Sequence, residues 1–136
     1  MDPLVSASRV ASSALSAQST RLRIVAENLA NSDSTGSTPG SDPYARKLVT
    51  FEQVNGKGGS PIVRVRTIER DTRPFTLELR AGHPAADEKG YVKLPNVDPL
   101  VEIADLKDAN RAYQASLQSI RQVRELISMT IDLLKG

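Results

Sequence analysis

The two ends of this chain of 136 residues carry the same pattern, in which mostly apolar residues recur at alternating spacings of four and three. Near the N-terminus the pattern covers eight positions: Leu4, Ser8, Ala11, Leu15, Gln18, Leu22, Val25 and Leu29. Such spacing puts the side chains on one face of an α-helix and is typical of the a and d positions of a coiled coil. Asp2 and Pro3 suit the cap and first turn of that helix. We predict a helix about 37 Å long from Leu4 to Leu29, ending near Asn31.

The C-terminal pattern repeats this design over a longer segment. Asp98 and Pro99 supply a second cap and a second helix-starting proline. The apolar face then holds nine positions at strict four–three spacing: Leu106, Asn110, Tyr113, Leu117, Ile120, Arg124, Ile127, Ile131 and Leu134. Glu102 and Asp105 lie near the positive end of the helix dipole and Lys135 near its negative end, which stabilises the helix. We predict that this helix runs to the penultimate residues of the chain.

The segment between the two helices has a different period. Residues 32–42 (SDSTGSTPGSD) form a polar linker without side chains that build a core. Beyond it lie four short stretches of β character, at residues 47–54, 62–68, 75–79 and 91–94. The dipeptides Asn55-Gly56 and Gly58-Gly59 separate the first two stretches, which predicts a β-hairpin with a loop longer than two residues.

The third of these stretches alternates apolar and polar residues. Phe75, Leu77 and Leu79 alternate with Thr76 and Glu78, which predicts a strand with one solvent-facing side. The whole chain has two Phe, three Tyr and no Trp. The middle module therefore has little apolar volume, and we expect it to pack against a neighbouring element for stability.

Together these elements predict a mainly α fold with a small β insertion. The long N- and C-terminal helices are expected to pair antiparallel as a coiled coil, because each is stable in water only when its apolar stripe is covered. The predicted domains are a discontinuous helical coiled-coil domain at residues 1–31 and 98–136, a polar linker at 32–42, and a small β-rich module at 43–97 that contains the hairpin.

Both stripes are wider than a single helix–helix contact needs. Val10 and Ala14 widen the first stripe, and Leu126 and Leu133 widen the second. Two arrangements would cover these flanks. One is a bundle of three or four helices that leaves some apolar surface exposed, and the other is an assembly in which copies of the chain or its relatives cover them. The pattern alone does not choose between the two.

Polar residues interrupt the stripes at four positions: Ser8, Gln18, Asn110 and Arg124. Either they are solvated positions at a stripe edge, or they are buried and fix the register between subunits, as an Asn at an a position does in coiled coils. The first interpretation is the simpler one for any single residue.

The composition excludes several classes of function. The chain has no cysteine and one histidine, which rules out disulfides, thiol nucleophiles and Cys-based or multi-His metal sites. The formal net charge is +2 and no segment is strongly basic, so we expect no surface that neutralises nucleic-acid phosphates. No apolar run approaches the ~20 residues that cross a bilayer. The N-terminal residues also lack the pattern of a cleaved secretory signal.

Catalysis is not expected either. His83 is the only candidate for a general base, and its Gly-His-Pro context favours a turn. Asp87 and Glu88 are adjacent, whereas paired catalytic carboxylates face each other across a cleft. The segment 56–59 (GKGG) lacks the strand–loop–helix context of a phosphate-binding loop. We therefore predict no enzyme activity, no cofactor, no metal and no small-molecule substrate.

Several short motifs resemble one family. Residues 28–31 (NLAN) end the first helix as in flagellar axial proteins, the components of the rod and hook. Residues 43–51 (PYARKLVTF), 82–92 (GHPAADEKGYV) with 94–97 (LPNV), and 110–115 (NRAYQA) resemble the FlgC family of basal-body rod proteins, in the same order along the chain. The resemblance departs at Ser116, in the linker, and just after Phe51. The motif residues that we single out are Asn28, Asn31, Pro43, Tyr44, Arg46, Lys47, Gly82, His83, Pro84, Gly90, Tyr91, Pro95 and Asn96.

This resemblance implies a structural protein of the proximal rod, the driveshaft that joins the membrane-embedded motor ring to the distal rod and hook. It implies helical polymerisation in which the terminal helices form the inner layer around the export channel and the middle module faces outward. The implied partners are other copies of the chain, proximal and distal rod proteins, the motor (MS) ring with rod–ring adaptor proteins, and the flagellar type III export apparatus. The implied location is the basal body, where the rod spans the periplasm and is reached by export without a cleaved signal peptide.

On this interpretation the apolar stripe residues form the assembly interface: Leu4, Ala11, Leu15, Leu22, Val25, Leu29, Leu106, Tyr113, Leu117, Ile120, Ile127, Ile131 and Leu134. The alternative from another class is a helical adaptor or export chaperone that binds a client helix without polymerising. We also expect the side chains of Asn28 and Asn31 to satisfy backbone groups at the end of the first helix. The simpler interpretation is that both are ordinary asparagines near a helix C-terminus.

Overall fold

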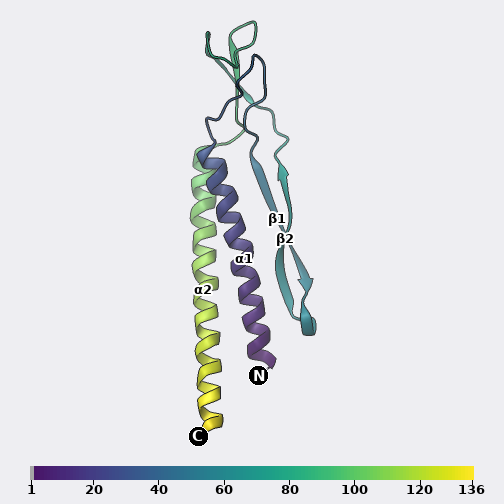
Figure 1. Ribbon diagram of the computed structural model, residues 1–136, viewed down its shortest axis with the longest axis vertical. Helices are drawn as coiled ribbons and strands as arrows, with labels where there is room; N and C mark the ends of the chain where they lie inside the picture. Colours follow the sequence, from purple (N-terminus) through teal and green to yellow (C-terminus); the bar gives the residue numbers. More distant parts are fainter. Residues whose placement is uncertain (1) are drawn as a thin grey trace. The chain divides into compact units, whose positions relative to one another are not determined.

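Two long helices dominate the computed structural model, which describes residues 2–136 (Figure 1). Helix α1 spans Asp2–Ala30 and helix α2 spans Pro99–Lys135. Both predicted helices are confirmed to within two residues at each end. At the start of α2, the Asp98 carboxylate accepts a hydrogen bond from the Leu100 amide at 3.0 Å, which confirms the second predicted cap. The predicted cap at Asp2 falls outside the described side chains.

Two small antiparallel sheets form the β part of the fold. Strands β1 (Lys47–Asn55) and β2 (Pro61–Arg70) make a hairpin, joined through a short 3-10 turn, η1, at Lys57–Gly59. Strands β3 (Thr76–Leu79) and β4 (Tyr91–Leu94) make the second sheet, in which Thr76 pairs with Leu94. All four predicted strands are present, and so is the long hairpin loop. The mainly helical fold with a β insertion is therefore confirmed.

The described chain divides into two compact units. The first comprises Met1–Leu22, Thr50–Thr67 and Lys107–Gly136, and the second comprises Arg23–Val49 and Ile68–Leu106. Among the described helices, none combines the length and hydrophobicity of a membrane-spanning segment.

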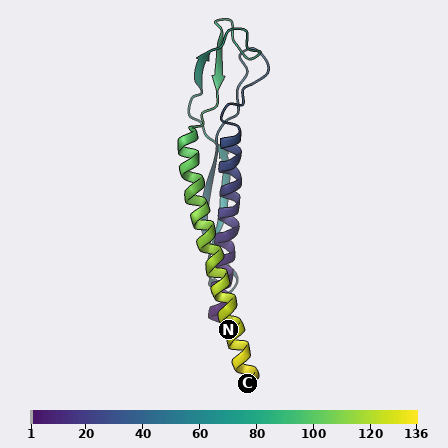
Figure 2. The ribbon, with the colours of Figure 1, turned by 90° about the vertical axis from the view of Figure 1, so that its left-hand side faces the viewer.

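In the first unit, α1 lies between α2 and the β1–β2 hairpin, and the two helices run in opposite directions (Figures 1 and 2). The core here is thin, because the buried apolar residues are few and mostly small: Ala11, Ala17, Ala109 and Ile120. The hairpin is fastened to α1 by polar contacts. The Val63 amide donates to Ser13 Oγ at 3.2 Å, and the Ser60 and Ser6 hydroxyls lie 2.9 Å apart. The β1–β2 hairpin therefore packs against a neighbouring element, as expected, and that element is α1.

The second unit contains the end of α1, the start of α2 and the β3–β4 sheet. Its core residues are Ile24, Val25, Ala85 and Val92, each at most 5% exposed. The prediction of one solvent-facing side for β3 is wrong, since all four residues of this strand are exposed and Leu77 and Leu79 are 58% and 62% exposed. The reason is that β3 belongs to a two-stranded sheet with β4, and the pairing leaves the Leu77 and Leu79 side chains largely exposed.

Candidate functional site

The predicted interface residues on α1 are mostly covered within the chain itself. Ala11 and Val25 are buried, and four others are half-buried: Leu4, Leu15, Leu22 and Leu29. Coverage is this extensive because α1 has α2 on one side and the hairpin on the other. Its solvent-exposed positions form a single strip that includes Arg9, Ser16 and Arg23. Most of the apolar surface of this helix is therefore covered by other parts of its own chain.

Helix α2 is covered on one side only. Among its predicted interface residues, Ile120 is buried, Leu106, Tyr113, Leu117 and Ile127 are half-buried, and Ile131 and Leu134 are 40% and 79% exposed. The last turns of α2 extend past the N-terminal end of α1 (Figures 1 and 2). They also carry Met129 and Leu133, which are 56% and 82% exposed. An apolar surface of this extent is typical of a protein–protein contact.

The polar residues in the stripes do not share one environment. Asn110 and Arg124 are exposed, whereas the neighbouring Ala109 is buried and Val123 is half-buried. The face of α2 turned toward α1 is thus rotated by one residue from the predicted row at these two places. Gln18 of α1 is different, because its Oε1 atom is buried without a hydrogen-bond partner among the described residues.

In the second unit, several motif residues converge on a buried polar junction. Asn28 is 1% exposed, and its amide group donates to the Lys47 carbonyl and accepts from the Lys47 amide, both at 2.9 Å. The Tyr44 hydroxyl also donates to Asn28 Oδ1 at 2.7 Å, and Asn28 Nδ2 lies 3.3 Å from a carboxylate oxygen of Glu102. One side chain therefore ties the end of α1 to the start of β1 and the first turns of α2.

Arg46 is the cationic centre of this junction. Its guanidinium donates to the Glu102 carboxylate, and it lies 3.4 Å from a carboxylate oxygen of Asp71 and 3.4 Å from one of Asp105. The Glu102 side chain is fully buried and that of Arg46 is 14% exposed. Burial by itself lowers the pKa of Arg46, but the hydrogen bond and charge of Glu102, together with Asp71 and Asp105, raise it overall. Arg46 therefore stays protonated although its side chain is largely buried.

Asp71 links the junction to the turn before β3. Its carboxylate accepts from Arg73 Nε at 2.8 Å and from the Arg73 amide at 2.9 Å. Chiefly because of the hydrogen bond from the Arg73 side chain, the pKa of Asp71 falls to about 2. Asn96 closes the cluster by donating to the Asp71 carbonyl at 3.1 Å while accepting from the Arg46 amide at 2.7 Å.

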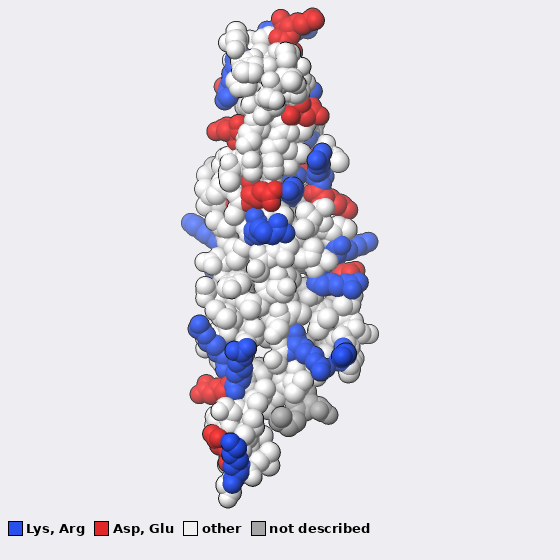
Figure 3. Space-filling view, in the orientation of Figure 1, with Lys and Arg blue, Asp and Glu red and all other residues white. Residues whose placement is uncertain are grey.

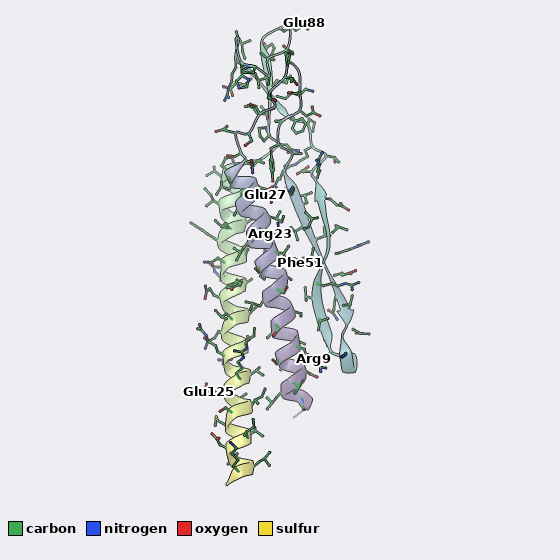
Figure 4. The ribbon with its side chains drawn as sticks, in the orientation of Figure 1. Arg9, Arg23, Glu27, Phe51, Glu88 and Glu125 are labelled. Atoms are coloured by element: carbon green, nitrogen blue, oxygen red, sulfur yellow. The ribbon has the colours of Figure 1, made fainter. Side chains whose placement is uncertain are left out.

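Tyr44 and Lys47 complete the junction near the end of α1. Burial, reinforced by the nearby charges of Glu27 and Glu102, raises the pKa of the Tyr44 phenol to about 12. Lys47 forms an ion pair with Glu27, which Figure 4 shows on the last turns of α1. Both motif residues bind other segments of the chain, and both also line a pocket of about 420 Å³ beside the end of α1.

The expectation for the two asparagines is confirmed for one and wrong for the other. Asn31 Nδ2 donates to the Glu27 carbonyl at 2.9 Å, so it satisfies a backbone group at the end of its own helix. Asn28 instead satisfies the backbone of Lys47, which is 19 residues away. The amide of Asn28 points away from the helix axis and toward β1, so it cannot reach the terminal carbonyls of α1.

Four of the remaining motif residues lie in the turn between β3 and β4: Gly82, His83, Pro84 and Gly90. Gly82 and Gly90 have φ angles of +85° and +87°, in the left-handed region that favours glycine. His83 Nδ1 accepts from the Ala85 amide at 3.0 Å, which is a turn contact. Tyr91 is 41% exposed and Pro95 is buried. Among the described residues, no three His, Asp or Glu side chains are grouped in a way that could hold a metal ion.

Sequence reasoning missed Glu102 and Asp71 as members of the junction. The sequence pattern gives Glu102 a role only through the helix dipole, although this residue lies four residues before Leu106 on the same face of α2. An acidic residue in line with a buried apolar row needs a buried cation, and Arg46 in the PYARK segment can supply it. The position of Glu102 in line with the apolar row of α2 could therefore have predicted the Arg46–Glu102 ion pair.

Two family models match the chain: "Flagella basal body rod protein" over residues 9–37, and "Flagellar basal body rod FlgEFG protein C-terminal" over residues 88–133. The chain is 54% identical to the flagellar basal-body rod protein FlgC of Agrobacterium fabrum, across 100% of this chain and 99% of the relative. The chain belongs to the FlgC family of flagellar basal-body rod proteins. The FlgC proteins of Salmonella typhimurium and Bacillus subtilis are 41% and 32% identical to it, each over 91% of this chain and over 92% and 93% of the relative.

Membership of the FlgC family confirms the resemblance found in the sequence. It makes the chain a structural subunit of the flagellar basal-body rod and not an enzyme. The adaptor or chaperone alternative is therefore set aside. For a structural subunit, the surfaces that matter are those left for neighbours, and the junction supports them by fixing the ends of both helices.

Proposed function

We propose that this rod subunit polymerises helically through its terminal helices and that the resulting tube transmits torque around the export channel. The observation that carries the proposal is the C-terminal end of α2, where Met129, Ile131, Leu133 and Leu134 are between 40% and 82% exposed. Within the described chain these side chains are only partly covered, and Leu133 and Leu134 are covered least. Neighbouring subunits would cover them, and contacts that repeat without closing generate a tube.

The proposal also covers the pairing of the helices, the division into domains, the partners and the location of the subunit. Helices α1 and α2 pair as an antiparallel coiled coil, and residues 1–31 and 98–136 act as the assembly domain, with 32–42 as linker and 43–97 as an outward-facing module. We place the subunit in the proximal rod, in contact with other copies, with proximal and distal rod proteins, and with the motor (MS) ring and its rod–ring adaptor proteins. It reaches the periplasm through the flagellar type III export apparatus without a cleaved signal.

The assembly interface includes the predicted stripe residues that the chain leaves open. A subunit in a driveshaft must resist torsion, and helices packed on several sides do so because packed interiors have low compressibility. The thin Ala-rich contact between α1 and α2 permits close approach of the helices. The exposed end of α2 supplies the apolar surface for the next contact.

The test is to replace Ile131 or Leu134 by Asp in a flagellated bacterium that depends on this chain. Both side chains are exposed in the subunit, so the substitutions leave its own core intact. We expect the variants to be made and exported but depleted about tenfold or more from purified basal bodies, with loss of swimming. Thr76→Asp, at an exposed position of β3, is the control. Normal incorporation of both helix variants would contradict the proposal.

A further inference from the structure

A cationic pocket lies where the hairpin tip meets α1. It has a volume of about 340 Å³ and is lined by Ser8, Arg9, Ser12, Ser13, Gly56, Lys57 and Ile62. No acidic residue is among these lining residues. Arg9 donates to the Lys57 carbonyl at 3.2 Å, which fixes the guanidinium beside the hairpin tip (Figure 4). The pocket therefore offers two cations, serine hydroxyls and one apolar side chain to whatever binds it.

The hairpin turns at two glycines beside this pocket. Gly58 and Gly59 have φ angles of +76° and +79°, and a Cβ atom added at either residue would meet no described atom within 4 Å. The chain thus turns sharply beside Lys57, and the two glycines lie outside the lining of the pocket. In Figure 3 the visible face beside the hairpin tip shows basic groups and no acidic group.

The outer face of α2 carries acidic side chains that could pair with the cations of this pocket. Glu125, Met129 and Asp132 follow one another at spacings of four and three, so they form one row on the helix. All three are exposed, and among the described residues neither carboxylate has a hydrogen-bond or ion-pair partner. The side of α2 turned to α1 carries Ile120 and Ile127, and Glu125 points away from α1 (Figure 4).

We propose that this row of α2 seats in the cationic pocket of a second copy of the chain. Glu125 and Asp132 would pair with Arg9 and Lys57 of that copy, and Met129 would lie against Ile62. The proposal rests on the proposed polymerisation and names one of its contacts. Charge complementarity selects the occupant, because both charged side chains that line the pocket are cations and the row presents two carboxylates beside an apolar side chain.

The contact joins two different surfaces that lie on opposite sides of the first unit. Glu125 of the row lies on the far side of α2 from α1 (Figure 4), and the pocket is lined by residues of α1 and of the hairpin. Each copy therefore keeps a free pocket after using its row, and a free row after its pocket is filled. Such a head-to-tail contact adds further copies in one direction instead of closing into a pair.

Charge reversal on each side, followed by recombination, tests the contact. Arg9→Glu/Lys57→Glu and Glu125→Lys/Asp132→Lys should each lower the number of copies in purified basal bodies about tenfold, and the chain with all four changes should recover most of the loss. Arg66→Glu and Glu88→Lys, at exposed positions outside both surfaces, are the matched controls and should incorporate normally. Normal incorporation of both double variants, or failure of a folded fourfold variant, would overturn the contact.

The absence of native cysteine allows a second measurement that keeps every charge in place. Oxidised basal bodies from a Ser12→Cys/Met129→Cys chain should yield a ladder of disulfide-linked copies, whereas each single-cysteine chain should stay monomeric. A chain that is present in basal bodies but forms no ladder overturns this contact and leaves polymerisation standing. A chain that is absent from basal bodies even as wild type overturns the polymerisation itself. A link to a different rod protein would replace the second copy as the occupant.

Discussion

The Asn28 amide donates to and accepts from the same residue, Lys47, as a paired residue in a β-ladder would. Arg46 next to it binds Glu102, which is fully buried on α2. These bonds connect segments that are far apart in sequence, so the junction forms only when both ends of the chain are in place. At this scale, single polar residues decide where the helices start and end relative to the sheet.

Replacing Glu102 by Ala should be strongly destabilising, because it leaves the buried Arg46 guanidinium without its main partner. We expect the free energy of unfolding, measured by urea denaturation followed by circular dichroism, to fall by about 3–5 kcal/mol. The double variant Arg46→Met/Glu102→Leu should recover most of that loss, since it removes both charges. Exposed Glu125→Ala serves as the control. A double variant as unstable as the sum of the two single variants would contradict this account.

Asp71 should make the fold sensitive to acid. Its pKa is about 2 in the folded chain against an ordinary value of 3.8, so the carboxylate contributes stability above about pH 4. That contribution, at most about 2 kcal/mol, is lost as the pH falls from about 4 to about 2. The difference in unfolding free energy between the native chain and Asp71→Asn should therefore shrink over this window. A difference that stays constant with pH would rule out Asp71 as the cause.

At the scale of elements, the two terminal helices play unequal parts. Helix α1 is covered on two sides, whereas α2 is covered on one side and carries the exposed apolar end. The hairpin accounts for this difference, because it contacts the side of α1 that carries Ser6, Arg9 and Ser13. The stripe-widening residues Val10 and Ala14 lie beside α2 instead. The wide stripe of α1 is thus used within the chain, and that of α2 is left for neighbours.

Gln18 is a weak point of α1 in the isolated subunit. Its Oε1 atom is buried without a described partner, which costs stability relative to an apolar side chain of similar size. Gln18→Met should raise the free energy of unfolding by about 1 kcal/mol, measured by urea denaturation. Gln53→Met, at an exposed position of β1, should change it little. A destabilised Gln18→Met chain would show that the amide is paired in solution.

At the scale of the whole molecule, the subunit has well-buried parts and an open end. Ile24, Asn28, Val92 and Glu102 are at most 2% exposed, whereas Leu133 and Leu134 are about four-fifths exposed. Local stability follows burial, so the end of α2 should open far more readily than the junction. Assembly would then order the residues that the single chain leaves exposed.

Hydrogen exchange on the isolated chain and on purified basal bodies checks this directly. In the isolated chain, amides of residues 129–135 should exchange at least about a hundredfold faster than those around Asn28. In basal bodies the same amides should become protected, because neighbours cover them. Equal protection of this end in both samples would show that the subunit needs no neighbour to order it.

The sequence alone determined both long helices, all four strands and the family, since helix and strand periods and local motifs are properties of short segments. It also singled out Asn28, Tyr44, Arg46, Lys47 and Asn96 as motif residues. Only the tertiary structure brought them together with Glu102 and Asp71, and only it exposed Leu77 and Leu79. Periodicity marks a face as apolar or polar, but which neighbour covers that face depends on contacts between segments distant in the chain.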